Sequence, residues 1–395
     1  MADSAHPEDL EQARGRLSRL LEFCNADPDN VSLLADIADL ALACGEQGTA
    51  RDAVQHALSL EPGNPYFQLR LSSIAIAEGN YAEAIEITRR LQAQGQHDPA
   101  IGYNLAHALF CDKAYAGARE VLQPLFEANV LTDPQASLLI RACHYLGEID
   151  LAIAVARQVL ERSPDNASVA GMLSLLYVDA NELPSAAKYA AQTLQVAPEN
   201  LDALLAASTV ALAAEDPLET RTLALRAISV QPQSGRAWAN LGMADMFEMQ
   251  LDAALGHLIK AVHYMPEHLG TWHMLGWVYL LKNDIDAAES TFNQALAIDE
   301  NFGESHGALA TTAAMRGDWE LADKRQKIAR RLNPQSMFAQ YVELLRLKRD
   351  GHQDQIDATL KAVLSNTKAP SGGNLLEMLG RFVLKNNQGK PPSRG

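Results

Sequence analysis

The sequence predicts an all-α fold in which helical hairpins stack into a solenoid, because two columns of residues recur every 34 positions. The first column holds alanine in eight of nine units: Ala50, Ala84, Ala118, Ala152, Ala186, Thr220, Ala254, Ala288 and Ala322. The second column holds proline at seven of ten positions: Pro28, Pro62, Gln96, Val130, Pro164, Pro198, Pro232, Pro266, Glu300 and Pro334. Neither column needs an insertion or a deletion, so the period sets the architecture.

A third column lies 24 residues before each proline position and holds mostly small residues: Ala38, Ser72, Ala106, Ile140, Ser174, Ser208, Gly242, Gly276 and Ala310. A large aliphatic residue precedes it in every unit but one. Small and large residues side by side suit two antiparallel helices whose axes approach closely and bury an aliphatic seam. Each unit is therefore predicted to be a hairpin of a first and a second helix.

The individual elements follow from this period. Residues 7–25 are predicted as one amphipathic helix that caps the first hairpin, and residues 31–336 as nine tandem units of 34 residues. Where the proline column is empty, Asp98-Pro99 and Asp133-Pro134 supply an N-cap and a first-turn proline for the next hairpin. Six units have a glycine or an asparagine where the first helix needs a left-handed stop: Gly45, Gly79, Gly147, Asn181, Asn283 and Gly317.

The pattern fades after residue 336 without ending there. Residues 337–370 are predicted as a degenerate tenth unit, in which Ile356 replaces the alanine. Residues 371–387 are predicted as a C-terminal capping helix that covers the open end of the stack. Residues 388–395 are a polar tail with two prolines, which we expect to be disordered.

Two units carry the residues of a known signature. The better one has Trp272, Leu275, Gly276, Tyr279, Ala288 and Phe292, with Glu300 in place of proline. The unit before it has Trp238, Leu241, Gly242, Ala254, Ala261 and Pro266, but Asp245 where the signature has tyrosine. This pattern resembles the tetratricopeptide repeat (TPR) over nine units. The resemblance implies a TPR-type α-solenoid, a right-handed superhelix whose concave groove binds a protein or peptide partner.

Length and charge narrow the class of protein. A chain of 395 residues could hold two or three globular domains, but the repeat favours one solenoid. The net charge of −16 divides into 18 basic against 41 acidic residues (−23) over 1–315 and 15 against 8 (+7) over 316–395. So acidic a chain repels phosphate backbones, and we expect no nucleic-acid partner. The basic end could dock an acidic partner or be a solvated helix face.

The cysteines and the hydropathy pattern indicate a cytoplasmic protein. Cys24, Cys44, Cys111 and Cys143 show neither metal-binding nor disulfide-like spacing, which suits a reducing compartment. Met1 to Leu10 is acidic and lacks the apolar stretch of a signal peptide. No segment is apolar for long enough to cross a bilayer, so we expect no membrane insertion. The Ala- and Leu-rich composition favours a bacterial source.

No catalytic motif is present, so the sequence predicts a protein that is not an enzyme and has neither catalytic residues nor a cofactor. His263, His268, His273 and His306 fall in neighbouring units, which raises the question of a metal site. Their spacing matches no ligand motif, so they are predicted to be ordinary polar helix residues.

By resemblance to the family, the groove is lined by positions 2, 5, 6, 9, 12 and 13 of each unit. In units seven and eight these positions hold the predicted partner-binding set, hereafter the apolar set: Arg236, Asn240, Met243, Met246, Phe247, His273, Met274 and Trp277. Aromatic side chains are costly to leave exposed, and methionine adapts to irregular partners. An apolar groove with a few polar groups suits an amphipathic helix or an extended peptide. The alternative is that these side chains fill gaps between adjacent first helices.

The same positions in units two to four hold a second, polar set: Arg70, Asn104, His107 and Arg141. Two arginines and an asparagine on one face could clamp a carboxylate or an acidic peptide. The set does not match the family's chaperone carboxylate clamp, and isolated surface residues are the alternative. Asn104 and Asn240 both occupy position 6, where the repeats of O-GlcNAc transferases carry an asparagine ladder, but the other units lack asparagine there.

The function predicted is therefore a non-catalytic scaffold or adaptor that holds a partner peptide or helix in its groove. The alternatives are an accessory subunit of a glycosyltransferase-like enzyme or of a secretion assembly, and a peptide-sensing regulator. About 60 residues follow the last regular unit, too few for a glycosyltransferase domain. A homo-oligomer is possible, and the sequence does not identify the partner.

Overall fold

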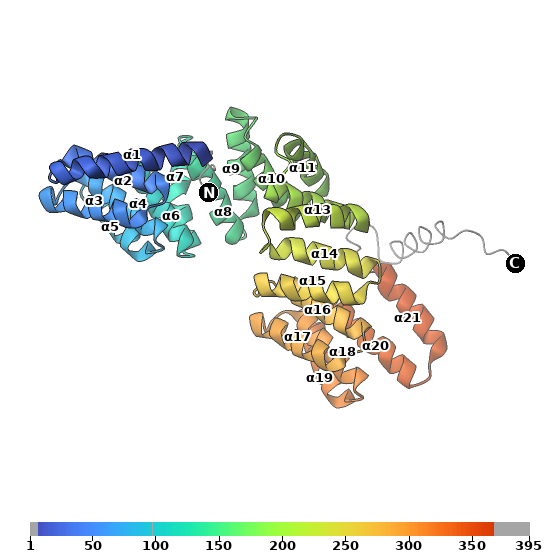
Figure 1. Ribbon diagram of the computed structural model, residues 1–395. Coiled ribbons are helices and arrows are strands. Elements are labelled where there is room, and N and C mark those ends of the chain that lie inside the picture. The colour runs from blue at the N-terminus through green and yellow to red at the C-terminus, as the bar shows by residue number, and fades with distance from the viewer. Residues whose placement is uncertain (1–6, 97, 367–395) are drawn as a thin grey trace. The chain divides into compact units, whose positions relative to one another are not determined.

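The computed structural model describes residues 7–96 and 98–366, and within them all regular structure is helical (Figure 1). The predicted capping helix 371–387, the tail 388–395 and the last four residues of the predicted tenth unit lie outside the described residues. In chain order the helices are α1 (Pro7–Ala26), α2 (Val31–Cys44), α3 (Gln47–Leu60), α4 (Pro65–Ala77), α5 (Tyr81–Ala93), α6 (Pro99–Cys111), α7 (Tyr115–Glu127), α8 (Asp133–Tyr145), α9 (Ile149–Arg162), α10 (Ala167–Asp179), α11 (Leu183–Val196), α12 (Leu201–Ala213), α13 (Pro217–Val230), α14 (Gly235–Phe247), α15 (Leu251–Tyr264), α16 (Leu269–Leu281), α17 (Ile285–Ile298), α18 (Gly303–Met315), α19 (Trp319–Leu332), α20 (Met337–Arg349) and α21 (Gln353–Asn366).

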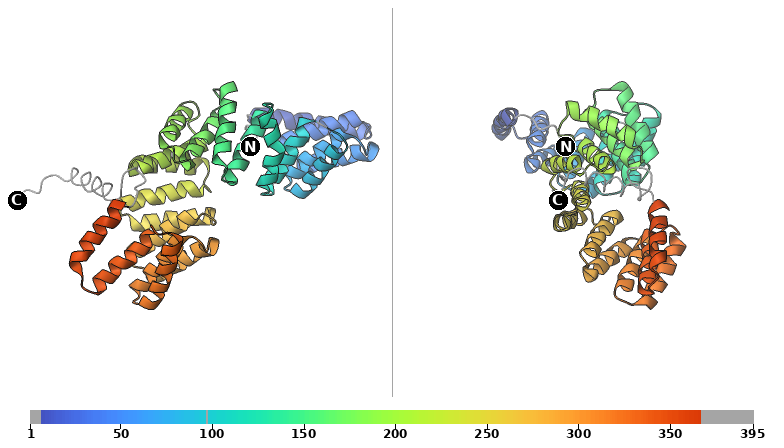
Figure 2. Two further views of the ribbon diagram at one scale, coloured as in Figure 1. Left: turned by 180° about the vertical axis from the view of Figure 1, so that it is seen from behind. Right: turned by 90° about the vertical axis from the view of Figure 1, so that its right-hand side faces the viewer.

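From α2 onward the even-numbered helices are the first helices of hairpins and the odd-numbered ones the second helices. Two compact units divide the chain, Met1–Leu176 and Tyr177–Gly395. Within each unit, helices pack mainly on the neighbours that precede and follow them in the chain, an order that the colours of Figure 2 also follow. The predicted all-α stack of helical hairpins is confirmed.

The turn inside every hairpin contains one residue in the left-handed conformation. These residues recur every 34 positions: Gly45, Gly79, Lys113, Gly147, Asn181, Glu215, Met249, Asn283, Gly317 and Gly351. All six predicted stops are confirmed. Lys113, Glu215 and Met249 adopt the same backbone although each carries a Cβ, at a cost of roughly 1–2 kcal/mol each. The geometry of the hairpin therefore overrides local preference at these three sites.

The turn between hairpins takes two forms, and proline is compatible with one of them. Glu61, just before Pro62, has φ −129° and ψ 73°, outside the α region, because a residue that precedes proline clashes with the proline ring in that region. At the equivalent positions of two of the three units without proline, Gly95 and Asn129 have φ of 78° and 57°, whereas Asp299, before Glu300, has φ −144° and ψ 106°. Two turns therefore both preserve the period, and the non-α kind is found before Pro62, Pro164, Pro198, Pro232, Pro266 and Pro334.

The two predicted N-caps differ in outcome. Asp98 caps α6, and its side chain accepts a hydrogen bond from the Ala100 amide. The cap of α8 is Thr132 instead of Asp133, so this helix begins one residue earlier than predicted. The reason is that Thr132 and Gln135 form a capping box, in which the Thr132 amide donates to the Gln135 side chain.

The seams of the hairpins contain the two small-residue columns. Every member of the alanine column is fully buried, Thr220 included. At the third column, a Cβ on Gly276 would lie 2.2 Å from the Phe292 ring, and one on Gly242 would lie 2.7 Å from Leu258. The missing side chains therefore make room for large residues of the partner helix.

Position 4 of the repeat ties each first helix to the turn before it. Trp238 and Trp272 donate from the indole nitrogen to the Pro232 and Pro266 carbonyls, at 2.8 and 2.7 Å. The His306 ring bonds the Glu300 carbonyl in the same way at 2.8 Å. These tryptophans orient the hairpins, and this position contributes to the stack instead of to the groove.

Candidate partner-binding surfaces

The two polar members of the apolar set join consecutive first helices. Asn240 on α14 is buried and donates to the hydroxyls of Ser208 (2.8 Å) and Thr209 (2.9 Å) on α12. His273 on α16 is buried and bonds the hydroxyl of Ser305 on α18 at 3.0 Å. For both residues the structure favours the alternative interpretation, contact between adjacent first helices.

Burial also determines the charge of His273. Loss of solvation lowers its pKa from 6.5 to about 4, so the ring is neutral at physiological pH. The ring lies among the aromatic residues Phe292, Phe302 and Phe338, with centroids 5.4 to 5.9 Å away. His273 therefore offers no positive charge to a partner at neutral pH.

Trp277 is covered by a helix of the same chain. Its ring stacks on Phe338 of α20, with centroids 4.5 Å apart and planes inclined by 21°. Tyr341 of the same helix lies 6.4 Å from the Trp277 ring. Trp277 and Phe338 both join a core cluster with Phe292 and Leu309. The aromatic residue predicted to anchor a partner is thus half-buried beneath α20.

Helix α20 reaches Trp277 because it departs from the regular stacking. Each of the second helices α13, α15 and α17 packs on the following first helix, whereas α20 packs mainly on α18 and only slightly on α19. The approach is close at Gly307, where a Cβ would lie 2.7 Å from the Ser336 hydroxyl and 2.9 Å from Phe338. The small residues along α18 therefore allow α20 to pack closely against it.

A carboxylate at the start of α20 stabilises this arrangement. Glu304 accepts hydrogen bonds from the Ser336 hydroxyl (3.0 Å) and from the Met337 amide (3.2 Å). A negative charge at a helix N-terminus accepts hydrogen bonds from the free amides and is attracted by the partial positive charge of the helix dipole. At the other side, Gln326 of α19 donates to the Ala339 carbonyl at 2.6 Å.

The remaining members of the apolar set lie on α14 and α16. Met246 and Met274 pack on a core cluster that contains Leu258 and Leu275. Arg236, Met243 and Phe247 have the spacing of one helical face, and all three are partly exposed. The Arg236 guanidinium pairs with Asp179 at 2.9 Å, at the end of α10 and thus two hairpins earlier in the chain.

The polar set, like the apolar set, contains both buried and at least partly exposed side chains. Asn104 on α6 is buried and donates to Ser72 and Ser73 on α4, both at 2.9 Å. Asn240 makes the equivalent pair of bonds in its own unit, so the two asparagines at position 6 make the same structural contact. Neither amide is directed to solvent.

Arg70 is engaged by an acidic residue and a tyrosine. Its guanidinium pairs with Asp39 at 2.6 Å and lies 4.9 Å from the centre of the Tyr66 ring, whose hydroxyl also donates to Asp39. His107 is half-buried beside Tyr103, and desolvation lowers its pKa. Arg141 is exposed. No single carboxylate clamp assembles from these residues in the contacts described.

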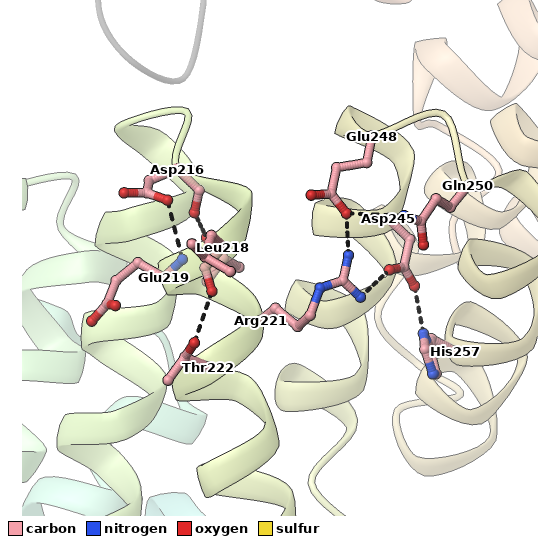
Figure 3. Close-up of polar contacts among 10 residues, drawn as sticks. Asp216, Leu218, Glu219, Arg221, Thr222, Asp245, Glu248, Gln250 and His257 are labelled. Atoms are coloured by element: carbon pink, nitrogen blue, oxygen red, sulfur yellow. Dashed lines mark hydrogen bonds and ion pairs between the residues drawn. The ribbon is translucent and has the colours of Figure 1, made fainter. Parts of the chain in front are cut away.

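A charged network occupies the tyrosine position of unit seven, where the sequence has Asp245. The Asp245 side chain is fully buried and bonds Arg221 of α13 and His257 of α15, both at 2.6 Å. Arg221 also pairs with Glu248 (Figure 3). The signal that could have predicted it is a carboxylate at an apolar position, because a buried charge requires a partner.

No cluster of three or more His, Cys, Asp or Glu side chains in the described part of the chain could bind a metal ion. No helix among the described residues is long and apolar enough to span a bilayer.

Comparison with known proteins agrees with this geometry. Models described as tetratricopeptide repeat match residues 46–102, 75–143 and 248–321, and a further one matches 139–202, which together cover more than half of the chain. The chain belongs to the tetratricopeptide-repeat family.

The relatives and neighbours are more distant. BBSome complex member BBS4 of Bos taurus is 25% identical over 65% of this chain and 49% of its own length, and bbs-4 of Caenorhabditis elegans is 22% identical over 72% and 63%. The chain thus spans about half the length of the bovine relative. A human IFIT1 dimer with PPP-AAAA has a TM-score of 0.55 at 16% identity, covering 98% of this chain and 95% of that one. That likeness shows the fold alone.

Proposed function

We propose that this protein is a non-catalytic scaffold that holds a segment of a partner protein on the exposed faces of its first helices. Membership of the tetratricopeptide-repeat family supports an interaction role. The relatives named as BBSome complex members support a place in a multi-protein assembly. A reducing, cytoplasmic compartment agrees with the four free cysteines.

We place the principal contact on α14. The observation that carries this proposal is that Arg236, Met243 and Phe247 share one face of α14 and remain partly exposed, whereas Asn240 and Trp277 are already engaged within the chain. Methionine and phenylalanine offer adaptable apolar area, and the adjacent ion pair of Arg236 offers polar groups that orient a partner.

The chemistry of the partner follows from the charge of the chain. A net charge of −16 repels nucleic acids and acidic proteins at long range. An amphipathic helix with apolar residues at i, i+3 or i+4 and i+7 and with a basic flank would complement α14 and its surroundings.

The test uses the full chain as bait in affinity purification followed by mass spectrometry. Met243→Glu together with Phe247→Glu should lower recovery of the principal partner at least tenfold, because a carboxylate in an apolar contact is left desolvated. The melting temperature should change little, since both side chains are partly exposed. Val196→Glu on α11, at a side chain 74% exposed, is the matched control and should retain the partner.

Two results would count against the site on α14. If the double variant keeps its partner, the polar surface with Arg70, His107 and Arg141 is the next to be substituted. If both the double variant and the control lose the partner, the effect reflects added negative charge and not a defined site.

A further inference from the structure

The outer surface of α13 differs from that of the other second helices. In each second helix from α3 to α19, positions 18, 22, 25 and 29 of the repeat form one row along the helix. Every such row contains at least one charged residue except that of α13, which reads Leu218, Thr222, Leu225 and Ser229. Leu218 is 71% exposed and Leu225 is 50% exposed. We call these four residues the α13 row.

The two hydroxyl groups of the α13 row donate their hydrogen bonds within the helix, so they need no water as an acceptor. The Thr222 hydroxyl donates to the Leu218 carbonyl at 2.9 Å, and the Ser229 hydroxyl donates to the Arg226 carbonyl at 2.7 Å. Covering the row would therefore bury four apolar or internally bonded side chains and leave no unpaired hydroxyl donor. Such a surface tolerates a dry contact.

The charges beside the row indicate what covers it. Glu219 and Arg226 lie on one flank, seven residues apart, and no ion pair is found for either among the described residues, while one nitrogen of Arg226 donates to the Pro198 carbonyl at 2.7 Å. When two copies of α13 pack antiparallel about a two-fold axis, each Glu219 faces the partner's Arg226. In the same register Thr222 packs beside the partner's Leu225, and Leu218 packs beside the partner's Ser229. The helix is thus complementary to itself.

We propose that two copies of this chain associate through α13, with the α13 row at the centre of a two-fold interface. A chain with net charge −16 resists self-association wherever charged rows meet, and the α13 row avoids that repulsion. A pair of helices of about 21 Å buries less than the ~1,200 Å² of a standard stable interface, so we expect a weak, reversible dimer. The inference concerns the outer face and is independent of the partner site on α14.

Sedimentation velocity of the full chain over a hundredfold range of concentration tests the dimer. The wild type should shift from monomer to dimer, and Leu218→Glu with Leu225→Glu should remain monomeric throughout. Ser290→Glu with Asn293→Glu adds the same charge to the corresponding row of α17 and should dimerise like the wild type. A wild type that stays monomeric, or a leucine variant that still dimerises, overturns the proposal.

Charge exchange then tests the register. Glu219→Arg should raise the dimer dissociation constant roughly tenfold, because arginine then faces the partner's Arg226 in both copies. Arg226→Glu alone should have a similar effect through two facing glutamates. The double exchange, Glu219→Arg with Arg226→Glu, should restore the dissociation constant to within about threefold of the wild type. Additive weakening in the double exchange would overturn the antiparallel two-fold arrangement.

Discussion

At the scale of single residues, this fold depends on pairs in which one residue has no side chain and the residue packed against it has a large one. Gly276 has no side chain because the Phe292 ring occupies that space, and Gly242 stands in the same relation to Leu258. Elsewhere the same two positions hold other combinations: Ser208 with Ala224, and Ile140, the one large residue of the column, with Ala156. Complementarity, more than the identity of one residue, is repeated.

Gly276→Ala should therefore lower the free energy of unfolding by about 1–3 kcal/mol, because the new methyl group overpacks the seam at Phe292. Gly256 on α15 is the matched control, since a Cβ there meets nothing within 4 Å. Gly256→Ala should raise stability by about 0.5–1 kcal/mol through helix propensity. Urea denaturation of both variants measures the difference. Equal effects of the two substitutions would contradict close packing at Gly276.

At the scale of elements, the end of the repeat array departs from its own pattern. Helix α20 begins at the residue that the period predicts, yet it packs on α18 instead of lying mainly on α19. Gly307 permits the approach, Glu304 binds the first turn, and Phe338 inserts beside Trp277. The last described hairpin is held by these few specific contacts as well as by the aliphatic seam.

Phe338→Ala should release α20 and α21 while the preceding hairpins stay folded. Removing a fully packed aromatic side chain costs about 3–5 kcal/mol, and a terminal hairpin has a neighbour on one side only. Hydrogen exchange should show lost protection in α20 and α21 and preserved protection in α14 and α15. Tyr341→Ala, at a half-buried residue of the same helix, should cause a smaller loss. Uniform loss of protection along the chain would contradict independent docking of α20.

At the scale of the whole molecule, stability is the sum of contacts between neighbours. Most contacts within each compact unit join helices that are one or two apart in the chain, and a few side-chain contacts, such as Trp277 with Phe338 and Arg236 with Asp179, reach four helices along. Charged pairs reinforce this order between successive hairpins. Arg51 pairs with Glu78, Arg119 with Glu148 and Arg221 with Glu248, each bridging to the next unit from position 21 of the repeat. A local perturbation should therefore remain local.

Ala152→Leu and Ala288→Leu test this locality, because both alanines are fully buried at helix crossings in different compact units. Each substitution should cost on the order of 1–3 kcal/mol by overpacking. For Ala152→Leu, hydrogen exchange should accelerate in α8 to α11 and stay unchanged in α16 to α19, and the reverse should hold for Ala288→Leu. A change spread over both regions in either variant would refute a nearest-neighbour description.

Periodicity alone determined the hairpins of this protein, their lengths and their buried columns, because each hairpin repeats the same local problem of two helices and one tight turn. It also located six of the left-handed stops, because glycine and asparagine are the residues that adopt the left-handed conformation most readily. It missed Lys113, Glu215 and Met249, where packing imposes the same turn on residues that do not favour it.

Only the tertiary structure decided which groove positions remain open. Asn104, Asn240 and His273 are polar residues at positions predicted to face a partner, but each bonds a hydroxyl on a neighbouring first helix. Trp277 is covered by Phe338, 61 residues further along the chain. A sequence column shows which residues share a position in the repeat. Whether such a residue is buried depends on the side chains that later helices place against it. Helix α20 keeps the 34-residue spacing in sequence but packs differently from the equivalent helices, so its contact with Trp277 could not be read from the column.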